Sequence, residues 1–314
     1  MNDPLYSLSG KRIWVAGHRG MVGSALMRRL EKVDCDVITA TRDDVDLLRQ
    51  DAVETWMDTN RPDAIFLAAA KVGGIYANDT WPADFLYNNL MIETNIIHAA
   101  HLADVGKLLF LGSSCIYPKM APQPMTEDVL LTGPLEPTNE WYAVAKIAGI
   151  KLCQAYRKQH GRDYISAMPT NLYGPGDNYN LETSHVAAAL LVKAHQAKLD
   201  GAENIEIWGT GTPKREFLHV DDLADGLVYL MEHYSEAEHI NIGSGDEVTI
   251  RELADTIAEA VGYEGGYVYN SDKPDGTPRK LMDCSRIHDL GWKAPTSLAD
   301  GMAQSYAWYL ENAL

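Results

Sequence analysis

Short apolar runs rich in β-branched residues alternate with longer stretches of helical periodicity along the first half of the chain. The apolar runs predict strands at 11–17, 35–41, 62–70, 107–114 and 163–174. The stretches between them predict helices at 21–33, around 52–59, at 85–105 and at 141–161. Strands that alternate with helices at this spacing predict a parallel sheet covered on both faces. The predicted fold class is therefore α/β, a doubly wound (Rossmann) sheet.

The pattern loosens after Gly174. Thr183 or Ser184 is predicted to cap the helix that follows, and 205–220 is predicted to form a hairpin around Gly209–Gly211. The chain then divides into a dinucleotide-binding domain and a smaller C-terminal α/β substrate-binding lobe. Their predicted bounds are 1–174 with a return segment at 215–242, and 175–214 with 243–314.

Composition narrows the classes of function. With 27 basic and 44 acidic residues among 314, the net charge is −17, and a field of that sign repels phosphate backbones, so no nucleic-acid partner is expected. The four cysteines are scattered without a CxxC pair, which argues against a zinc site and a disulfide scaffold. No apolar run approaches the ~20 residues of a membrane span, and the first residues do not form a signal peptide. We expect a cytoplasmic enzyme with no membrane association and no metal.

Three glycines, Gly17, Gly20 and Gly23, lie between the first predicted strand and its helix. A tight turn at this place lets the backbone approach a pyrophosphate, and the helix N-terminus offers free N–H groups to the anion. The spacing therefore predicts a dinucleotide site.

The end of the second strand bears on the choice of nicotinamide cofactor. An acidic residue there would bind the ribose 2′-hydroxyl of NAD, whereas this chain has Arg42, and Arg19 lies within the glycine turn. Two guanidinium groups favour the 2′-phosphate of NADP. Asp43 and Asp44 follow closely and keep NAD as an alternative.

Tyr142 and Lys146 form a YxxxK motif that places both side chains on one helix face. A nearby ammonium group is expected to lower the pKa of the phenol towards a useful range for proton transfer. Ser113, at the end of the fourth predicted strand, would complete a hydrogen-bonded site for a carbonyl oxygen.

With GxxGxxG, YxxxK and LAAAKVGG in this order, the chain resembles the extended short-chain dehydrogenase/reductases. Within that family it is similar to the branch that epimerises and reduces GDP-4-keto-6-deoxy-mannose. The segments that carry this likeness are AGHRGMVGSAL, LGSSCIYPK, EPTNEWYAVAKIAGIKLC, MPTNLYGPGDNYN, SHVAAALL and KPDGTPRKLMD. The resemblance implies that Ser113, Tyr142 and Lys146 form the reductase triad and that the hydride comes from NADPH.

Two further residues suit an epimerase. Cys115 lies two positions after Ser113, so strand alternation would place both on one face, and His185 lies at a predicted helix N-terminus, where the dipole disfavours the imidazolium. The resemblance implies that Cys115 and His185 are the acid–base pair that exchanges protons next to the ketone. Tyr142 and Ser113 could stabilise the enolate intermediate.

The resemblance also implies contacts with the ligands. The substrate, GDP-4-keto-6-deoxy-mannose, would contact Lys193, Trp208, Arg215 and Asp275, with Arg279 and Lys280 as additions. The implied cofactor contacts are Gly17, His18, Arg19, Gly20, Met21, Val22, Gly23, Arg42, Asp46, Ala69, Ala70, Leu111, Gly112, Ser113, Tyr142, Lys146, Pro169, Thr170, Asn171, Leu172 and His185.

Other functions remain open at this stage. A C4 reductase or epimerase acting on a related GDP-deoxy or GDP-heptose sugar would keep the same residues. A regulatory NADP-binding scaffold is disfavoured by the intact triad, and a dehydratase by the absence of an Asp-Glu pair from SSCIYPK. The helices around 85–105 and 141–160 resemble the pair through which this family forms homodimers.

Overall fold

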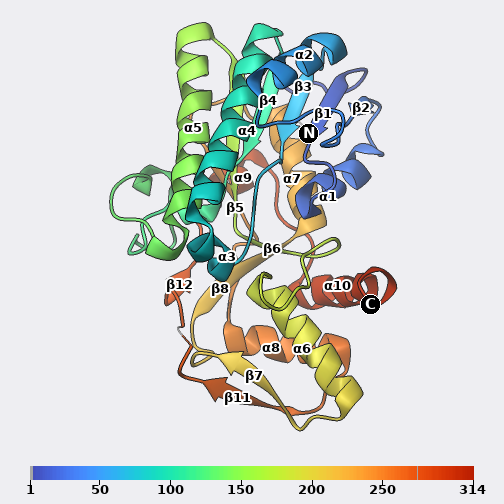
Figure 1. The fold of residues 1–314 in the computed structure, drawn as a ribbon, viewed down its shortest axis with the longest axis vertical. Coiled ribbons are helices and arrows are strands. Elements are labelled where there is room, and N and C mark those ends of the chain that lie inside the picture. The colour runs from blue at the N-terminus through green and yellow to red at the C-terminus, as the bar shows by residue number, and fades with distance from the viewer. Residues whose placement is uncertain (1–2, 274) are drawn as a thin grey trace.

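The computed structural model describes residues 3–273 and 275–314, and Figure 1 shows its two parts, a larger sheet domain and a smaller lobe. Six parallel strands form the main sheet in the order β2-β1-β3-β4-β5-β9. Their bounds are β1 Arg12–Ala16, β2 Asp36–Ile38, β3 Ala64–Leu67, β4 Lys107–Leu111, β5 Asp163–Pro169 and β9 Ile240–Ile242. The predicted doubly wound α/β fold is confirmed, with the strand order reversing between β1 and β3, where ligands bind in such sheets.

Helices cover both faces of this sheet. The helices around it are α1 Met21–Leu30, α2 Gln50–Asn60, α3 Ile75–Thr80, α4 Pro82–Leu102, α5 Glu140–His160, α7 Val220–His233 and α9 Ser285–Leu290. The long helices α4 and α5 pack against each other, with α2 beside α4, and α1 packs on α7 (Figure 1). Strand β3 is buried at all four positions, AIFL, as expected of a central strand covered on both faces.

The smaller lobe has its own apolar core. It contains the helices α6 Val186–Asp200, α8 Ile250–Val261 and α10 Leu298–Asn312, and the strands β6 Asn171–Tyr173, β7 Asn204–Trp208, β8 Lys214–His219, β10 Glu247–Thr249, β11 Gly266–Asn270 and β12 Arg279–Lys280. Leu191, Leu253, Ile257 and Met302 are buried at its centre. The segment around Ile287 instead packs into the core of the sheet domain.

The predicted hairpin at 205–220 is wrong. Strand β7 pairs in parallel with β11, whereas β8 pairs with β6, β10 and β12. The Asp275 carboxylate accepts hydrogen bonds from the backbone N–H of Thr210, at 2.6 Å, and from its hydroxyl. These bonds attach the turn to the distant Asp275. The two strands that flank the turn belong to different sheets.

Two further local predictions need correction. The strand predicted at 163–174 divides at Thr170, whose N–H donates to the Ile242 carbonyl, and β6 then leaves the main sheet to pair with β8. The N-cap of α6 is His185, not Thr183 or Ser184, and it makes no side-chain capping bond.

Candidate active site

The turn between β1 and α1 is shaped by close backbone packing. Gly17 has φ +91°, in the left-handed region that favours glycine, and a Cβ there would lie 2.7 Å from the backbone nitrogen of Ala69. A Cβ on Gly23 would collide with the Gly17 carbonyl. A Cβ on Gly20, by contrast, would meet only the Gly17 oxygen at 3.5 Å. Gly17 and Gly23 are therefore explained by packing, whereas the space beside Gly20 opens outward.

The same turn fits the pyrophosphate of a dinucleotide. Helix α1 starts at Met21 behind Gly20, which provides no side-chain cap, and its first turn contains no acidic residue. Its first N–H groups, including those of Val22 and Gly23, are therefore free to bind an anion. The buried Nδ1 of His18 also has no hydrogen-bond partner among the described residues.

Two arginines lie near this turn, one within it and one after strand β2. Arg19 and Arg42 are exposed, and neither forms an ion pair within 3–273 and 275–314. The Asp44 carboxylate accepts hydrogen bonds from the N–H and hydroxyl of Thr41, at 2.7 and 2.8 Å, which lower the pKa of Asp44. Asp46 accepts from the N–H of Leu48. The carboxylates are thus bound within their own loop, and the guanidinium groups remain available.

The other residues predicted to contact the cofactor follow the neighbouring strands at the same edge. Ala69 and Ala70 follow β3, Leu111 to Ser113 end β4, and Pro169 to Leu172 span the end of β5 and the start of β6. The carboxyl ends of parallel strands lie at the same edge of a sheet, so these segments line that edge. The Asn171 side chain donates to the Glu216 carbonyl at 2.8 Å, which fixes it against the smaller lobe.

Tyr142 and Lys146 lie on α5 beside the end of β4. The Lys146 ammonium group donates to the Leu111 carbonyl at 3.0 Å and lies 5.7 Å from the centre of the Tyr142 ring. Phe85 of α4 packs edge-to-face on that ring, with centroids 6.4 Å apart. The structure thus brings the YxxxK pair together with the strand end that carries Ser113.

The electrostatics of this pair differ from the sequence-based expectation. Burial raises the pKa of Tyr142 well above its ordinary value, with the Cys115 and Glu93 charges adding to the effect. Burial also lowers the pKa of Lys146. Burial therefore decides the pKa of this phenol, and the predicted lowering by the ammonium group is wrong for this state of the protein. Tyr142 is a protonated phenol, as a proton donor must be.

Cys115 lies in a short 3₁₀ turn, η1 Ser114–Ile116, and not on strand β4. The strand-alternation argument for its position is therefore wrong, but the turn still brings it to Ser113, whose hydroxyl oxygen accepts from the Cys115 N–H at 3.4 Å. Burial raises the pKa of the Cys115 thiol, whereas Lys280, the Ser113 hydroxyl and Lys146 lower it.

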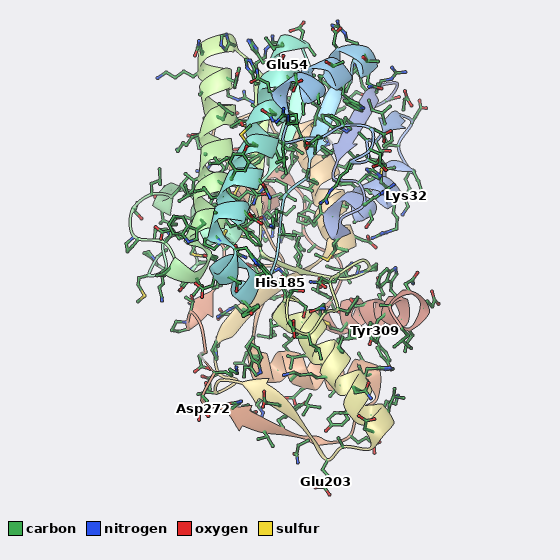
Figure 2. The ribbon with its side chains drawn as sticks, in the orientation of Figure 1. Lys32, Glu54, His185, Glu203, Asp272 and Tyr309 are labelled. Carbon is green, nitrogen blue, oxygen red and sulfur yellow. The ribbon has the colours of Figure 1, made fainter. Side chains whose placement is uncertain are left out.

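His185 lies at the N-terminus of α6, at the junction of the two parts of the molecule (Figure 2). The loop after β3 holds this segment, because the Gly74 N–H donates to the Thr183 carbonyl at 3.0 Å. His185 is an exposed residue, yet the neighbouring protein atoms still desolvate its ring. Desolvation and the charge of Lys280 lower the pKa of His185, so the imidazole is neutral, as predicted.

Lys280 of β12 is the charge shared by Cys115 and His185, since it acts on the pKa of both. The neighbouring Leu281 fixes this strand by exchanging backbone and side-chain hydrogen bonds with the 123–125 segment. Arg279, one residue earlier, is not brought to the site, and its Nε pairs with Glu247 at 2.7 Å. The sequence named both basic residues but could not separate them, because their opposite orientations depend on pairing with β8.

The residues predicted to contact the sugar nucleotide lie in the smaller lobe. Trp208 is 54% exposed, and the Lys193 and Lys273 ammonium groups lie 5.4 and 5.0 Å from its ring centre. Burial lowers the pKa of Arg215, while Asp275 raises it. Asp275 itself is bound to the 209–212 turn, so the structure gives it a role in holding that turn.

Sequence reasoning missed one buried group beside the triad, Glu93 of α4. It is 1% exposed and acts on the pKa of both Tyr142 and Lys146. An acidic residue at a core-facing position of this helix, in line with Phe85 and Ile97, was the available signal.

The described residues form neither a metal site nor a membrane-spanning helix. Among residues 3–273 and 275–314 no group of three or more potential ligands is placed to hold a metal ion. No helix in that part of the chain is long and apolar enough to cross a membrane.

Comparison with known proteins places this geometry in a family. A sequence profile of the NAD dependent epimerase/dehydratase family matches residues 13–243, which include the glycine turn, the YxxxK pair and His185. The chain belongs to this family. Its members are oxidoreductases and epimerases that bind a nicotinamide dinucleotide, so the chain is an enzyme of this kind.

Within the NAD dependent epimerase/dehydratase family the chain falls among the GDP-L-fucose synthases. It is 60% identical to GDP-L-fucose synthase 1 of Arabidopsis thaliana, covering 98% of this chain and 96% of that protein. It is 59% identical to the GDP-L-fucose synthase of Sinorhizobium fredii, covering 98% of each. Among solved structures, a GDP-mannoheptose C4 reductase from Campylobacter jejuni with NADP bound matches with a TM-score of 0.88 and 39% identity, covering 96% of this chain and 98% of that one.

Proposed function

We propose that this chain converts GDP-4-keto-6-deoxy-mannose to GDP-L-fucose, by epimerisation at C3 and C5 followed by NADPH-dependent reduction at C4. The observation that carries this proposal is the joining of two sets of residues in one site. The proposed triad of Ser113, Tyr142 and Lys146 is supported by the bond from Lys146 to the end of β4, and the proposed proton-exchanging pair, Cys115 and His185, by the charge of Lys280, which acts on both. A simple reductase does not need that second pair.

NADP is the cofactor that the sheet edge fits best. The N–H groups behind Gly20 would hold its pyrophosphate, and Arg19 and Arg42 would bind a 2′-phosphate, because the nearby carboxylates are already bound in their own loop. When bound, NADPH supplies the hydride that reduces C4. The sheet domain, predicted as 1–174 with 215–242, would carry this site. The smaller lobe, to which β6 and β8 belong although they fall inside those predicted bounds, would carry the sugar-nucleotide site.

Each member of the triad has a distinct task in reduction. Tyr142, a protonated phenol, donates its proton to the C4 oxygen as that oxygen gains negative charge. The Ser113 hydroxyl donates a hydrogen bond to the same oxygen, and Lys146, fixed by the Leu111 carbonyl, stabilises the phenolate that remains.

Epimerisation requires removal of a proton from one face of the carbon and return of a proton to the other. Cys115 and His185 come from separate segments, so they can act on the sugar from different sides, with Tyr142 and Ser113 stabilising the enolate at the C4 oxygen. His185 can accept a proton as the neutral imidazole and give one as the imidazolium, and Cys115 can accept one as the thiolate and give one as the thiol, so either group could be the base or the acid.

The nucleotide part of the substrate is proposed to lie along the smaller lobe. Trp208 offers an exposed aromatic face for a base, and Lys193 and Arg215 offer positive charge for the diphosphate. Asp275 would act by holding the turn between β7 and β8. A second candidate, a C4 reductase of a GDP-heptose, is favoured by the likeness to the Campylobacter jejuni reductase.

The protein is further proposed to be a homodimer that works in the cytoplasm. Tyr87 of α4 and Trp141 and Val144 of α5 are large apolar side chains that remain exposed, between 39 and 59%, on the two helices predicted to form the dimer interface. All four cysteines are free thiols, in keeping with a reducing compartment.

One assay tests the reaction. GDP-4-keto-6-deoxy-mannose is supplied with NADPH in D₂O, the loss of NADPH is followed by absorbance, and deuterium at C3 and C5 of the product is read by NMR. NADPH loss with label at both carbons supports the proposal. NADPH loss without label would make the enzyme a simple reductase, and turnover only of a GDP-4-keto-heptose would favour the second candidate.

A further inference from the structure

Glu216 of β8 is a buried carboxylate that the proposed mechanism does not use. It is 0% exposed, and both of its oxygens accept backbone hydrogen bonds from distant segments. Oε1 accepts from the Gly245 N–H at 2.9 Å, in the loop after β9, and Oε2 accepts from the Met282 N–H at 3.1 Å, just after β12. Hydrogen bonds to a buried carboxylate are strong, so this side chain connects the two segments firmly to β8.

The backbone of Glu216 extends the connection to the sheet domain. Its carbonyl accepts hydrogen bonds from the Thr170 hydroxyl at 3.3 Å and from the Asn171 side chain at 2.8 Å, between β5 and β6. The carboxylate is closely enclosed, because a Cβ on Gly243 would lie 2.0 Å from Oε1. Glu216 therefore joins three other segments of the chain to β8.

The stretch 281–283, directly after β12, is held from two sides. On one side the 123–125 segment binds it through three hydrogen bonds, two between backbone groups and one from a backbone N–H to the Gln123 side chain. On the other side the Met282 N–H donates to Glu216. A single carboxylate thus takes the place that a second neighbouring strand would occupy.

The position of β12 decides how four basic residues are arranged. Strand β12 pairs with β8 over only two residues, Arg279 opposite Lys214 and Lys280 opposite Arg215. Residues opposite each other on neighbouring strands share one face of the sheet, and the next pair lies on the other face. On one face Lys214 and Arg279 both pair with Glu247, at 3.3 and 2.7 Å. On the other face neither Arg215 nor Lys280 forms an ion pair within the described residues, so two cations lie side by side.

We propose that Glu216 is a positioning residue, which keeps β12 in register with β8 and so holds Lys280 beside Arg215 for the anionic substrate. This inference rests on the function proposed above, in which Arg215 offers positive charge to the diphosphate. Glu216 does not touch the substrate, since its oxygens are buried and bound to backbone N–H groups. It acts through the place that it gives to Lys280.

Glu216→Gln tests the inference with almost no change of shape. An amide has one oxygen and one NH₂ group, so either the Gly245 or the Met282 N–H loses its acceptor. KM for the sugar nucleotide should rise about tenfold with kcat almost unchanged. The affinity for NADPH should stay unchanged, because Thr170 and Asn171 bond the backbone carbonyl, which the variant keeps. A fall in kcat with KM unchanged would overturn the inference.

Calorimetry with GDP tests the same contact without turnover. Glu216→Gln and Lys280→Met should each weaken GDP binding about tenfold. In the double variant the two losses should not multiply, because Glu216 acts through the cation that Lys280→Met removes. Fully multiplied losses would show another route and would overturn the inference. A wild type that binds GDP but consumes no NADPH with GDP-4-keto-6-deoxy-mannose would contradict the proposed function, while the GDP measurements would still decide this inference.

The matched control is Glu127→Gln. Glu127 is also a buried glutamate, and it accepts the Asn241 N–H at 3.0 Å, but it pairs with Arg286 and, among the described residues, bonds none of β8 or β12. The control should lose thermal stability as Glu216→Gln does, while KM and the affinity for GDP keep their wild-type values. An equal loss of GDP affinity in the control would mean that any buried glutamate gives the effect, and the inference would be rejected.

A second variant covers the case in which Glu216→Gln does not fold. Gln123→Met removes the bond on the opposite side of the 281–283 stretch, and the fold should tolerate it because this side chain is only partly buried. The affinity for GDP should fall about threefold. A folded variant with wild-type GDP affinity would show that fixing β12 does not matter for the substrate and would overturn the inference.

Discussion

The proposed reductase and epimerase halves of this site are built in different ways. Tyr142 and Lys146 lie one turn apart on α5, against the end of β4, so local geometry and a single helix–strand contact place them. Cys115, His185 and Lys280 come from a 3₁₀ turn, a helix N-terminus and a two-residue strand of the smaller lobe. Reduction therefore depends on one rigid element, whereas epimerisation depends on how the two parts of the molecule meet.

The largest expected effect is on the reductase half alone. Tyr142→Phe removes the proton donor, so NADPH consumption should fall about a hundredfold or more. Exchange of deuterium at C3 and C5 should continue at a reduced rate, because Cys115 and His185 remain. The measurement is NADPH loss beside NMR in D₂O. Parallel loss of both activities by the same factor would show that the two halves are not separable.

Cys115→Ser should impair epimerisation and leave cofactor binding unchanged. A hydroxyl is a much weaker acid than a thiol, so label uptake should fall about a hundredfold while the affinity for NADPH, measured by calorimetry, stays unchanged. Label uptake at the wild-type rate would remove Cys115 from the proton-exchanging pair.

A smaller effect is expected from the charge that Cys115 and His185 share. Lys280 lowers the pKa of both groups, so Lys280→Met should raise both pKa values and move the pH profile of deuterium exchange to higher pH. At neutral pH the exchange rate should fall about tenfold.

Arg279→Met is the matched control for Lys280, since it removes a cation from the same strand that pairs with Glu247 instead. Its pH profile should remain that of the wild type. Equal shifts in the two variants would mean that the overall charge of the lobe matters and that the position of Lys280 does not.

The last prediction concerns the pH dependence of stability on the reductase side and leaves the catalytic residues unchanged. The pKa of Glu93 is raised from 4.5 to about 8 on folding, so the wild type loses stability as the pH rises through this window, while the unfolded chain ionises first. Glu93→Gln removes that loss. Its melting temperature relative to wild type should therefore increase between pH 4.5 and 8 and level off above. A difference that is constant with pH would mean that Glu93 has an ordinary pKa in the folded protein.

The same contrast explains what the sequence could predict. The doubly wound sheet, the glycine turn and the YxxxK helix depend on periodicity and short spacings, and the structure shows all of them where they were expected. The hairpin predicted at 205–220 is wrong because β7 pairs with β11, about sixty residues later, and no local pattern indicates that partner.

The remaining errors have similar physical causes. The orientation of Lys280 against Arg279 follows from the pairing of β12 with β8, and the pKa of Tyr142 follows from burial by α4. Both depend on surroundings contributed by distant segments. Glu93 could be placed on the inner face of its helix from the sequence, but its enclosure with Lys146 depends on the packing of α4 on α5.

A substitution at Gly74 could remove one activity without changing any residue that acts on the substrate. A methyl group at this position would lie 2.9 Å from the Ser184 carbonyl oxygen, so the backbone that leads into His185 would have to move away from the sheet. Exchange of a single hydrogen for a methyl group would then loosen the epimerase half and leave α5 intact. If Cys115 and His185 exchange protons as proposed, Gly74→Ala should turn an enzyme of two activities towards a reductase of one, which is a short route for natural divergence and for redesign.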